Sequence, residues 1–211
     1  HVDSSAASDV YKRQVSNMLR AYLGAFKSNS LNPKPNWKIV KETPSCATIN
    51  SDNGLGIVVA PQAMEIAVEK AKKTGAGIVT MNNCGHLGML AYHSMIASDN
   101  DMIGTTMAAC SPRMVPTYSS VRALGTNPIS YSAPADKLPD FVFDAAMTSV
   151  AGNKIVLASR LNVPLSPGWI ADKDGNPIMK EISIDELNHE DESKNLENRY
   201  NKGCLLYTSD A

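Results

Sequence analysis

The residues best suited to chemistry lie together in one short loop, Asn82-Asn83-Cys84-Gly85-His86-Leu87-Gly88. The loop follows an apolar run at residues 77–81, which is typical of a short buried strand. It precedes residues 89–97, whose apolar positions recur at helical spacing. No Asp, Glu, Lys or Arg occurs between residues 74 and 98, so we expect buried surroundings. Ligands of α/β sheets bind where strands end, which makes this loop a candidate site.

His86 is the side chain of this loop best suited to move a proton near neutral pH. A helix N-terminus favours the neutral, proton-accepting form of a histidine. We therefore expect His86 to be neutral and to titrate near its ordinary value. The alternative is a core histidine that is held by a backbone carbonyl and does no chemistry.

Two other loops carry polar groups that could bind a ligand. Gly125-Thr126-Asn127-Pro128 forms a tight turn in a long irregular segment at residues 108–134, and it offers a hydroxyl, an amide and backbone donors. A plain turn is the alternative. Asp144 follows a predicted strand at residues 141–143. It could cap the helix expected next or accept a hydrogen bond from a ligand hydroxyl.

The elements that must position these loops alternate between strands and helices. Strands are predicted at residues 37–40, 47–49, 56–60, 77–81, 102–107, 129–133 and 141–143, and helices at residues 15–26, 61–74 and 89–97. Pro61 and Gly75 are the expected start and stop of the second helix, on which Glu69 and Lys73 are spaced to pair. This order predicts an α/β fold with a mostly parallel or mixed sheet covered by helices.

The two ends of the chain encode one inverted DNA repeat. Residues 4–14 can be encoded by a string whose reverse complement, read in a shifted frame, gives the last eight residues, Cys204 to Ala211. The string resembles a transposon-based sequencing adapter, so we expect residues 1–14 and 204–211 to be adapter-derived and to pack against nothing specific. Residues 15–179 then form a partial globular domain, and residues 180–203 are expected to be a charged mobile segment.

Composition and missing motifs narrow the classes of function. A formal net charge of −1 gives no reason to expect nucleic acid or a membrane surface as a partner, and no apolar run approaches the ~18 residues that span a bilayer. Cys46, Cys84 and Cys110 have neither disulfide-framework nor zinc-site spacing, which predicts a reducing compartment, the cytoplasm. No GxGxxG follows a predicted strand, and no P-loop, GxSxG or HExxH occurs.

Five motifs in register resemble one known family. In chain order they are Asn83-Cys84-Gly85-His86-Leu87-Gly88, Leu124-Gly125-Thr126-Asn127-Pro128-Ile129, Phe143-Asp144-Ala145-Ala146, Ala151-Gly152-Asn153-Lys154 and Pro167-Gly168-Trp169-Ile170-Ala171-Asp172. Together they are similar to the malate/L-lactate dehydrogenase family, which includes ureidoglycolate and sulfolactate dehydrogenases. That family is distinct from the Rossmann-type lactate and malate dehydrogenases. The similarity extends over roughly residues 15–179.

The resemblance implies an oxidoreductase that transfers a hydride between NAD or NADP and a small 2-hydroxy acid or 2-keto acid. It implies a non-Rossmann dinucleotide-binding fold, with a cofactor-binding core in the partial domain at residues 15–179, and a homodimer at full length. By motif position, His86 matches the family's proton acceptor, and no metal ligand is implied. The cofactor contacts are matched by two segments, Gly125, Thr126 and Asn127, and Asp144, Ala145 and Ala146.

The chain departs from the family pattern at several positions. The family's Ser-His-Gly motif would precede Val15. Its substrate-binding arginine would fall at about Asn17, which leaves Arg20 as a displaced candidate for that contact. Met147-Thr148 stands where the family has Thr-Ser, and the segment that completes the nicotinamide pocket is missing. We therefore expect this fragment alone to be an incomplete enzyme.

Two rival functions use the same residues. The first is a non-enzymatic module that binds a small ligand or nucleotide, which cofactor binding without turnover would favour. The second is a metal-dependent hydrolase built on Cys84, His86, His93 and Cys110, although these residues lack a standard ligand spacing. Metal bound to protein purified without added metal would favour the hydrolase.

Overall fold

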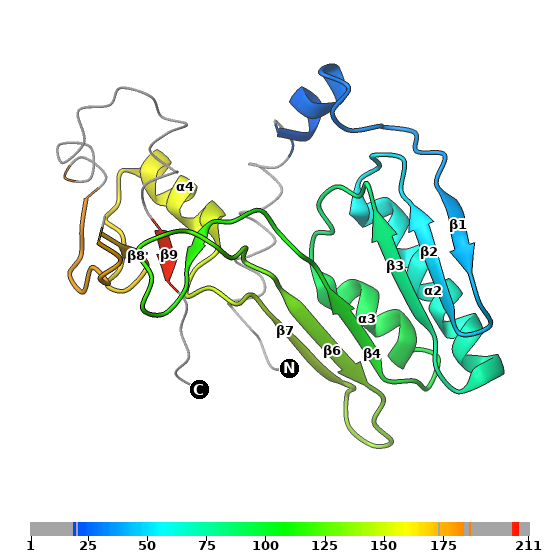
Figure 1. Ribbon diagram of the computed structural model, residues 1–211. Coiled ribbons are helices and arrows are strands. Elements are labelled where there is room, and N and C mark those ends of the chain that lie inside the picture. Colours follow the sequence, from blue (N-terminus) through cyan, green and yellow to red (C-terminus); the bar gives the residue numbers. More distant parts are fainter. Residues whose placement is uncertain (1–18, 20, 173, 184–185, 187–203, 207–211) are drawn as a thin grey trace. The chain divides into compact units, whose positions relative to one another are not determined.

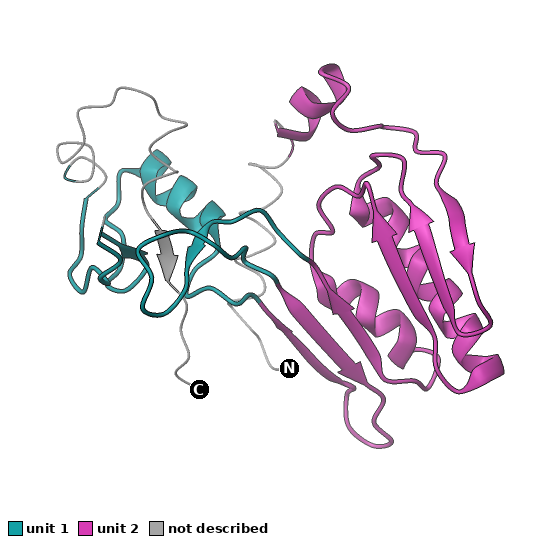
Figure 2. Ribbon diagram, viewed as in Figure 1, with its two compact units in different colours: residues 1–18, 109–127, 146–211 teal, residues 19–108, 128–145 magenta. Residues whose placement is uncertain are grey.

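The computed structural model describes residues 19, 21–172, 174–183, 186 and 204–206. The chain divides into two compact units, which Figure 2 colours separately. Unit 2 contains residues 19–108 and 128–145, and unit 1 contains residues 109–127 and the described residues from 146 onward. The core predicted within residues 15–179 contributes to both units, and its boundaries stay a prediction.

The first sheet of unit 2 has the strand order β1-β2-β3 (Figure 1). β1 (Lys38–Glu42) pairs antiparallel with β2 (Cys46–Asn50), and β2 pairs parallel with β3 (Ile78–Asn82). The two parallel strands are joined by α2 (Gly56–Thr74), whose buried residues pack against Ile49. The predicted βαβ unit is therefore present, with β2 as its first strand.

The strand predicted at residues 56–60 is wrong, because this segment is the beginning of α2. The Val59 N–H donates to the Leu55 carbonyl at 3.2 Å, so the helical ladder already starts here, and Pro61 lies inside the helix. A β-branched run favours a strand when its neighbours are unknown. Here Val59 is fully buried against Ile49 in the helical conformation, and this packing overrides the propensity.

The end of α2 agrees with the sequence, but its predicted ion pair does not. Gly75 follows the helix in the left-handed conformation, with a φ of +85°, and its N–H donates to the Ala71 carbonyl at 2.8 Å. Glu69 pairs with Lys72 at 2.8 Å instead of with Lys73. Positions three and four residues apart lie on the same helix face, so spacing alone cannot choose between them.

The burial expected for residues 77–81 holds on one side of β3 only. Val79 and Met81 pack against the core around Ile49, whereas Ile78 is 60% exposed and Thr80 is exposed as well. Successive side chains of a strand point to opposite faces, so an apolar run can be half-buried. The absence of charge in this segment is therefore no measure of its burial.

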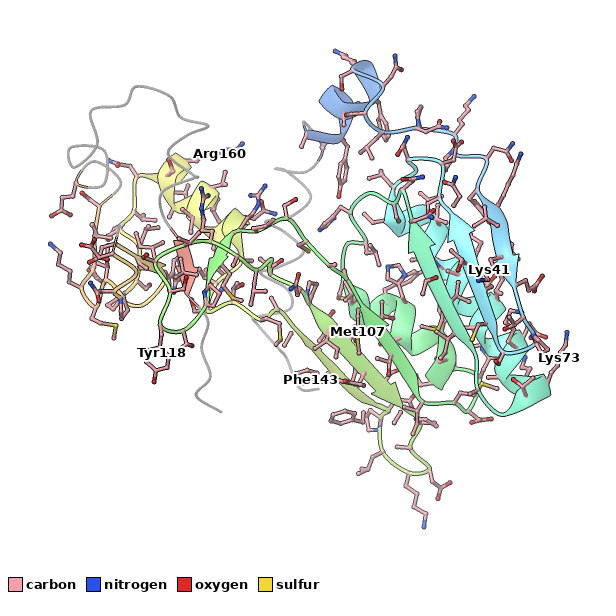
Figure 3. All side chains as sticks on the ribbon, in the orientation of Figure 1. Lys41, Lys73, Met107, Tyr118, Phe143 and Arg160 are labelled. Carbon is pink, nitrogen blue, oxygen red and sulfur yellow. The ribbon has the colours of Figure 1, made fainter. Side chains whose placement is uncertain are left out.

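The second sheet of unit 2 is antiparallel, with the order β4-β6-β7. It consists of β4 (Gly104–Met107), β6 (Ile129–Ala133) and β7 (Phe141–Ala145), and α3 (Leu90–Ser98) packs against it. Met107 and Phe143, labelled in Figure 3, remain substantially exposed on this sheet.

The predicted α/β class with a mixed arrangement of strands is confirmed. Within the described residues no helix is long and apolar enough to cross a membrane.

Small and hydroxyl-bearing residues form the contact between α3 and this sheet. The Ser94 and Ser130 hydroxyls lie 2.8 Å apart, and the Ser132 hydroxyl donates to the Ser94 carbonyl at 2.5 Å. All three serines are fully buried. A Cβ at Gly104 would overlap the same Ser94 carbonyl, so this strand approaches the helix closely because it has no side chain there.

Unit 1 is built around α4 (Gly152–Leu161) and short strands. Its core consists of Ala158, Leu165, Ile170 and Ile182. Residues 147–150 are bends, so the helix expected directly after Asp144 begins only at Gly152. Ile182 lies in the segment expected to be mobile, yet it is 3% exposed and exchanges two backbone hydrogen bonds with Leu165. Most of residues 184–203 lie outside the described residues.

The third sheet, in unit 1, has the order β5-β9-β8. β9 (Cys204–Leu206) pairs parallel with β5 (Met114–Val115) and antiparallel with β8 (Ile170–Ala171). The expectation that residues 204–211 pack against nothing is therefore wrong for β9. An unpaired strand edge accepts extended backbone of almost any sequence, so this pairing does not depend on the origin of the segment. Residues 1–14 and 207–211 lie outside the described residues.

Candidate functional site

His86 lies in the loop between β3 and α3, where two groups hold its ring. The Tyr22 hydroxyl lies 2.8 Å from His86 Nδ1, and the Gly88 N–H donates to the same nitrogen at 3.2 Å. A backbone N–H can only donate, so Nδ1 is an acceptor, and the neutral ring carries its hydrogen on Nε2. The neighbours of His86 therefore select its tautomer.

Burial lowers the pKa of His86 below its ordinary value of 6.5. Part of the side chain is exposed, but the protein atoms around the ring remove enough water to disfavour the charged form. The expectation of an ordinary pKa is therefore wrong. Burial causes this shift, whereas the expectation attributed the neutral ring to a helix N-terminus, and α3 begins four residues later at Leu90.

Tyr22 is a functional candidate that the sequence analysis missed. It lies on the helix at residues 21–27, the described part of the helix predicted at residues 15–26. Burial raises the pKa of Tyr22 above 10.0, so its hydroxyl keeps its proton at neutral pH and donates to His86 Nδ1. One signal was available in the sequence, namely a hydroxyl on an otherwise apolar helix face.

The backbone of the His86 loop is clamped against the start of α2. The Gly85 N–H donates to the Gly54 carbonyl at 2.8 Å, and the Ile57 N–H donates to the His86 carbonyl at 3.2 Å. The Ile57 N–H is one of the first-turn donors that a helix cannot satisfy by itself. Glycine is needed at position 56, because a Cβ there would crowd the Gly85 carbonyl oxygen. The loop is thus positioned by main-chain contacts.

Asp144 caps a helix, which was one of its two expected roles. The helix is α3, which precedes Asp144 in the chain, and not the helix expected directly after it. The Asp144 Oδ2 accepts a hydrogen bond of 2.8 Å from the Ala91 N–H. The helix expected directly after Asp144 is absent, which leaves the carboxylate free to reach the earlier one. Ala145 ends β7, and Ala146 follows it. The structure therefore brings Asp144 to the helix that begins after the His86 loop.

The tight turn predicted at Gly125-Thr126-Asn127-Pro128 is not observed, because residues 125–128 follow an irregular path without a turn. A Cβ at Gly125 would overlap the Cys110 carbonyl, so this close approach requires glycine. Asn127 has a φ of +32°, and its Oδ1 accepts a hydrogen bond of 3.0 Å from the Cys110 N–H. The Thr126 carbonyl accepts one of 2.8 Å from the Met147 N–H, next to Ala146. The segment is thus held by hydrogen bonds to Cys110 and to Met147.

The remaining candidates contribute less to a site. Arg20 lies outside the described residues. Burial raises the pKa of the half-buried Cys84 thiol above its ordinary value of 9.0. A protonated thiol is a weak nucleophile and a weak metal ligand. Among the residues that the structure describes, no group of three or more His, Cys, Asp or Glu side chains could hold a metal ion.

The fold and the site together define a mixed α/β protein that lacks a Rossmann fingerprint and presents a neutral histidine hydrogen-bonded to a tyrosine. The sequence pattern of the malate/L-lactate dehydrogenase family matches residues 11–181. The chain therefore belongs to that family, which confirms the resemblance.

Named relatives agree with this assignment. The chain is 43% identical over 156 residues to the L-sulfolactate dehydrogenase of Methanocaldococcus jannaschii, covering 74% of this chain and 45% of the relative. It is 37% identical over 162 residues to the malate dehydrogenase of Pyrococcus horikoshii, and the match covers 77% of this chain and 45% of the relative. The solved structure of the M. jannaschii sulfolactate dehydrogenase superimposes with a TM-score of 0.71 at 35% identity, over 94% of this chain and 55% of that one. The chain thus spans about half the length of these relatives.

Proposed function

We propose that the protein carrying this chain is an NAD- or NADP-dependent dehydrogenase that interconverts a small 2-hydroxy acid and the matching 2-keto acid. Family membership supports this class of reaction, and the Tyr22–His86 pair is the observation that carries the proposal. The relatives are named as malate and sulfolactate dehydrogenases, which favours a substrate of that kind. A homodimer in the cytoplasm belongs to the same proposal.

Each of the two segments that match the family's cofactor contacts carries polar groups that could bind part of a dinucleotide. Asn127 uses its Oδ1 on the Cys110 N–H, so its amide NH₂ is the part suited to a ligand. Thr126 adds a hydroxyl, and Asp144, engaged through Oδ2, can accept from a ribose hydroxyl through Oδ1. A bound nicotinamide would supply the hydride acceptor, and each segment is proposed as a cofactor contact because it matches the family pattern. Gly125, Ala145 and Ala146 complete the proposed contacts, and Arg20 is the proposed partner of the substrate carboxylate.

His86 and Tyr22 together handle the proton of the reaction. Oxidation of a 2-hydroxy acid releases a hydride from C2 and a proton from the hydroxyl oxygen. Nδ1 holds the lone pair of the neutral His86 ring, and the Tyr22 hydroxyl faces it at 2.8 Å. The Tyr22 oxygen takes the substrate proton while its own proton passes to Nδ1, and the imidazolium later loses that proton to water. Such general-base assistance contributes ~10²–10⁴-fold to a rate.

A longer gene product that contains this chain allows a direct test. We expect it to reduce NAD or NADP in the presence of malate or sulfolactate, followed by the absorbance of the reduced nicotinamide. His86→Gln keeps hydrogen-bonding capacity at similar size, so it should still bind cofactor while kcat falls ~10²-fold or more. Cofactor binding without turnover by the unmodified protein would establish the binding module instead.

A further inference from the structure

The peptide unit between Leu87 and Gly88 is bound by a histidine at each end. Its N–H, on Gly88, donates to His86 Nδ1 at 3.2 Å, and its carbonyl, on Leu87, lies 2.8 Å from His93 Nε2. This peptide is trans, so its carbonyl and its N–H point in opposite directions. The two histidines therefore hold opposite edges of one rigid plane.

His93 can only be a donor in this arrangement. The Leu87 carbonyl accepts, so the hydrogen is on Nε2 of His93. The side chain is 1% exposed, and its Nδ1 has no hydrogen-bond partner among the described residues. Burying an unpartnered nitrogen costs free energy. An apolar side chain would fill the same space without that penalty, so the packing alone does not explain a histidine here.

Gly88 makes the orientation of this peptide adjustable. Its φ is +74°, and glycine populates positive and negative φ with similar ease. If the Leu87–Gly88 plane rotated, its carbonyl would replace its N–H beside the His86 ring. A carbonyl facing Nδ1 would require Nδ1 to carry the hydrogen, and the lone pair would move to Nε2. The orientation of this plane therefore decides which ring nitrogen of His86 can accept a proton.

We propose that His93 is a positioning residue, which holds the Leu87 carbonyl, fixes the Leu87–Gly88 plane and so keeps Nδ1 of His86 as the proton acceptor opposite Tyr22. Hydrogen bonds in series also polarise one another, so the bond from His93 makes the Gly88 N–H a better donor to Nδ1. The catalytic consequence rests on the proposed function. The tautomer of His86, in contrast, can be measured without any turnover.

The test compares two variants of the 211-residue chain by ¹⁵N spectra of the imidazoles, with the His86 signals identified by their loss in His86→Gln. His93→Leu removes the donor and keeps an apolar side chain, whereas His93→Gln keeps an amide N–H near the place of Nε2. The wild type should carry its His86 hydrogen on Nε2. In His93→Leu we expect the tautomer ratio to shift about five- to tenfold toward Nδ1–H, and in His93→Gln to stay near that of the wild type.

A matched control lies at the other end of the same helix. Ser98→Ala removes the hydrogen bond from the Ser98 hydroxyl to the Met95 carbonyl, and the His86 tautomer should not change. Circular dichroism checks that each variant folds. If His93→Leu fails to fold, His93→Asn replaces it, since its shorter amide cannot reach the Leu87 carbonyl.

The outcomes separate this inference from the proposed function. A folded variant without the donor, in which the His86 tautomer is unchanged, overturns the positioning role of His93. A shifted tautomer in a chain whose longer gene product shows no dehydrogenase activity keeps the positioning role and rejects the proposed function. In an active product, His93→Leu should lower kcat more than it raises KM, because ground-state binding does not use the His86 lone pair.

Discussion

Three side chains of unit 2, His86, His93 and Tyr22, show how hydrogen-bond partners decide the role of an uncharged group. Burial lowers the pKa of His86 and of His93 and raises that of Tyr22, so all three are uncharged at neutral pH. A neutral tyrosine can donate its hydroxyl proton. A neutral histidine has one ring nitrogen that donates a hydrogen bond and one that accepts it. Gly88 makes His86 an acceptor at Nδ1, and Leu87 makes His93 a donor at Nε2.

The lowered pKa of His86 predicts a pH dependence for the proposed oxidation. Below that pKa, Nδ1 is occupied by a proton and the base is lost, so kcat should rise with pH through a single ionisation that lies below 6.5. A pH profile of kcat for the longer gene product measures it. His86→Gln should abolish this ionisation. If the ionisation stays in place in that variant, the proton belongs to another group.

Tyr22→Phe removes one hydroxyl and keeps the ring. We expect kcat to fall ~10²-fold, because the proton loses its path to Nδ1, while KM for the cofactor stays within a few-fold. The free energy of unfolding should change by only about 1 kcal/mol, since one partly exposed hydrogen bond is lost. Tyr92→Phe, on exposed α3 surface, is the matched control and should change neither quantity. Equal kcat values for the two variants would exclude Tyr22 from the proton path.

At the residue scale, the sequence alone selected His86 as a candidate but did not predict its hydrogen-bond partners. The position of His86 between an apolar run and a helical pattern was enough to select it. Tyr22 is 64 positions away from His86, and the bond of His93 to the Leu87 carbonyl does not follow from its place in a helical pattern. Such contacts depend on the tertiary path of the chain, which residue spacing does not contain.

At the scale of elements, the N-terminus of α3 depends on a carboxylate from another strand. Asp144→Ala removes the acceptor of the Ala91 N–H and a negative charge near the positive end of the helix dipole. We expect a loss of about 1 kcal/mol in the free energy of unfolding, measured with urea. Asp140→Ala is the control, because Asp140 accepts a comparable bond from Ala135 at an exposed turn. Equal losses would show that the position at the helix is unimportant.

The close contact between β4 and α3 predicts a severe effect from one added methyl group. A Cβ at Gly104 would overlap the Ser94 carbonyl, so Gly104→Ala should lower the free energy of unfolding by about 1–3 kcal/mol or more. Gly152→Ala is the matched control, because a Cβ there meets nothing within 4 Å and the residue starts α4. Thermal unfolding of both variants measures the difference. Similar stability in the two would mean that the sheet can shift away from the helix.

Most elements were predictable where a pattern repeats over several residues. The helix at residues 89–97, the strand at residues 129–133 and the stop at Gly75 agree with the structure. The failures occurred where a distant partner overrides local preference. Residues 56–60 become helical because Val59 packs on Ile49, and Asp144 caps a helix that lies 53 positions earlier.

At the scale of the whole molecule, the two histidines link stability to pH. Each has a folded-state pKa below its ordinary value of 6.5, so the unfolded chain binds more protons as the pH falls below 6.5. The free energy of unfolding should therefore decrease from about pH 7 downward, until the pH is below the folded-state values. Urea unfolding at a series of pH values measures this. His93→Gln should make the dependence shallower, and an unaltered slope would contradict the contribution of His93.

The division of the chain into two units was not visible in the sequence. The parallel pair β2–β3 and the antiparallel set β4-β6-β7 belong to one unit, although the same alternation of strands and helices predicts them as one sheet. Alternation constrains the class of fold, but strand order depends on pairing between distant segments. The mixed α/β class was therefore predictable, and the separate sheets were not.

The Leu87–Gly88 peptide also has a consequence for how this sequence can change during evolution. Positions 86, 88 and 93 all affect the orientation of the Leu87–Gly88 peptide, so the effect of a substitution at one of them depends on the other two. A substitution at position 93 is tolerated only if the new side chain also brings a hydrogen to the Leu87 carbonyl, as an amide or a hydroxyl could. A side chain at position 88 would strain a φ of +74° and press on Ile57. Descendants of this gene should therefore vary at these three positions together.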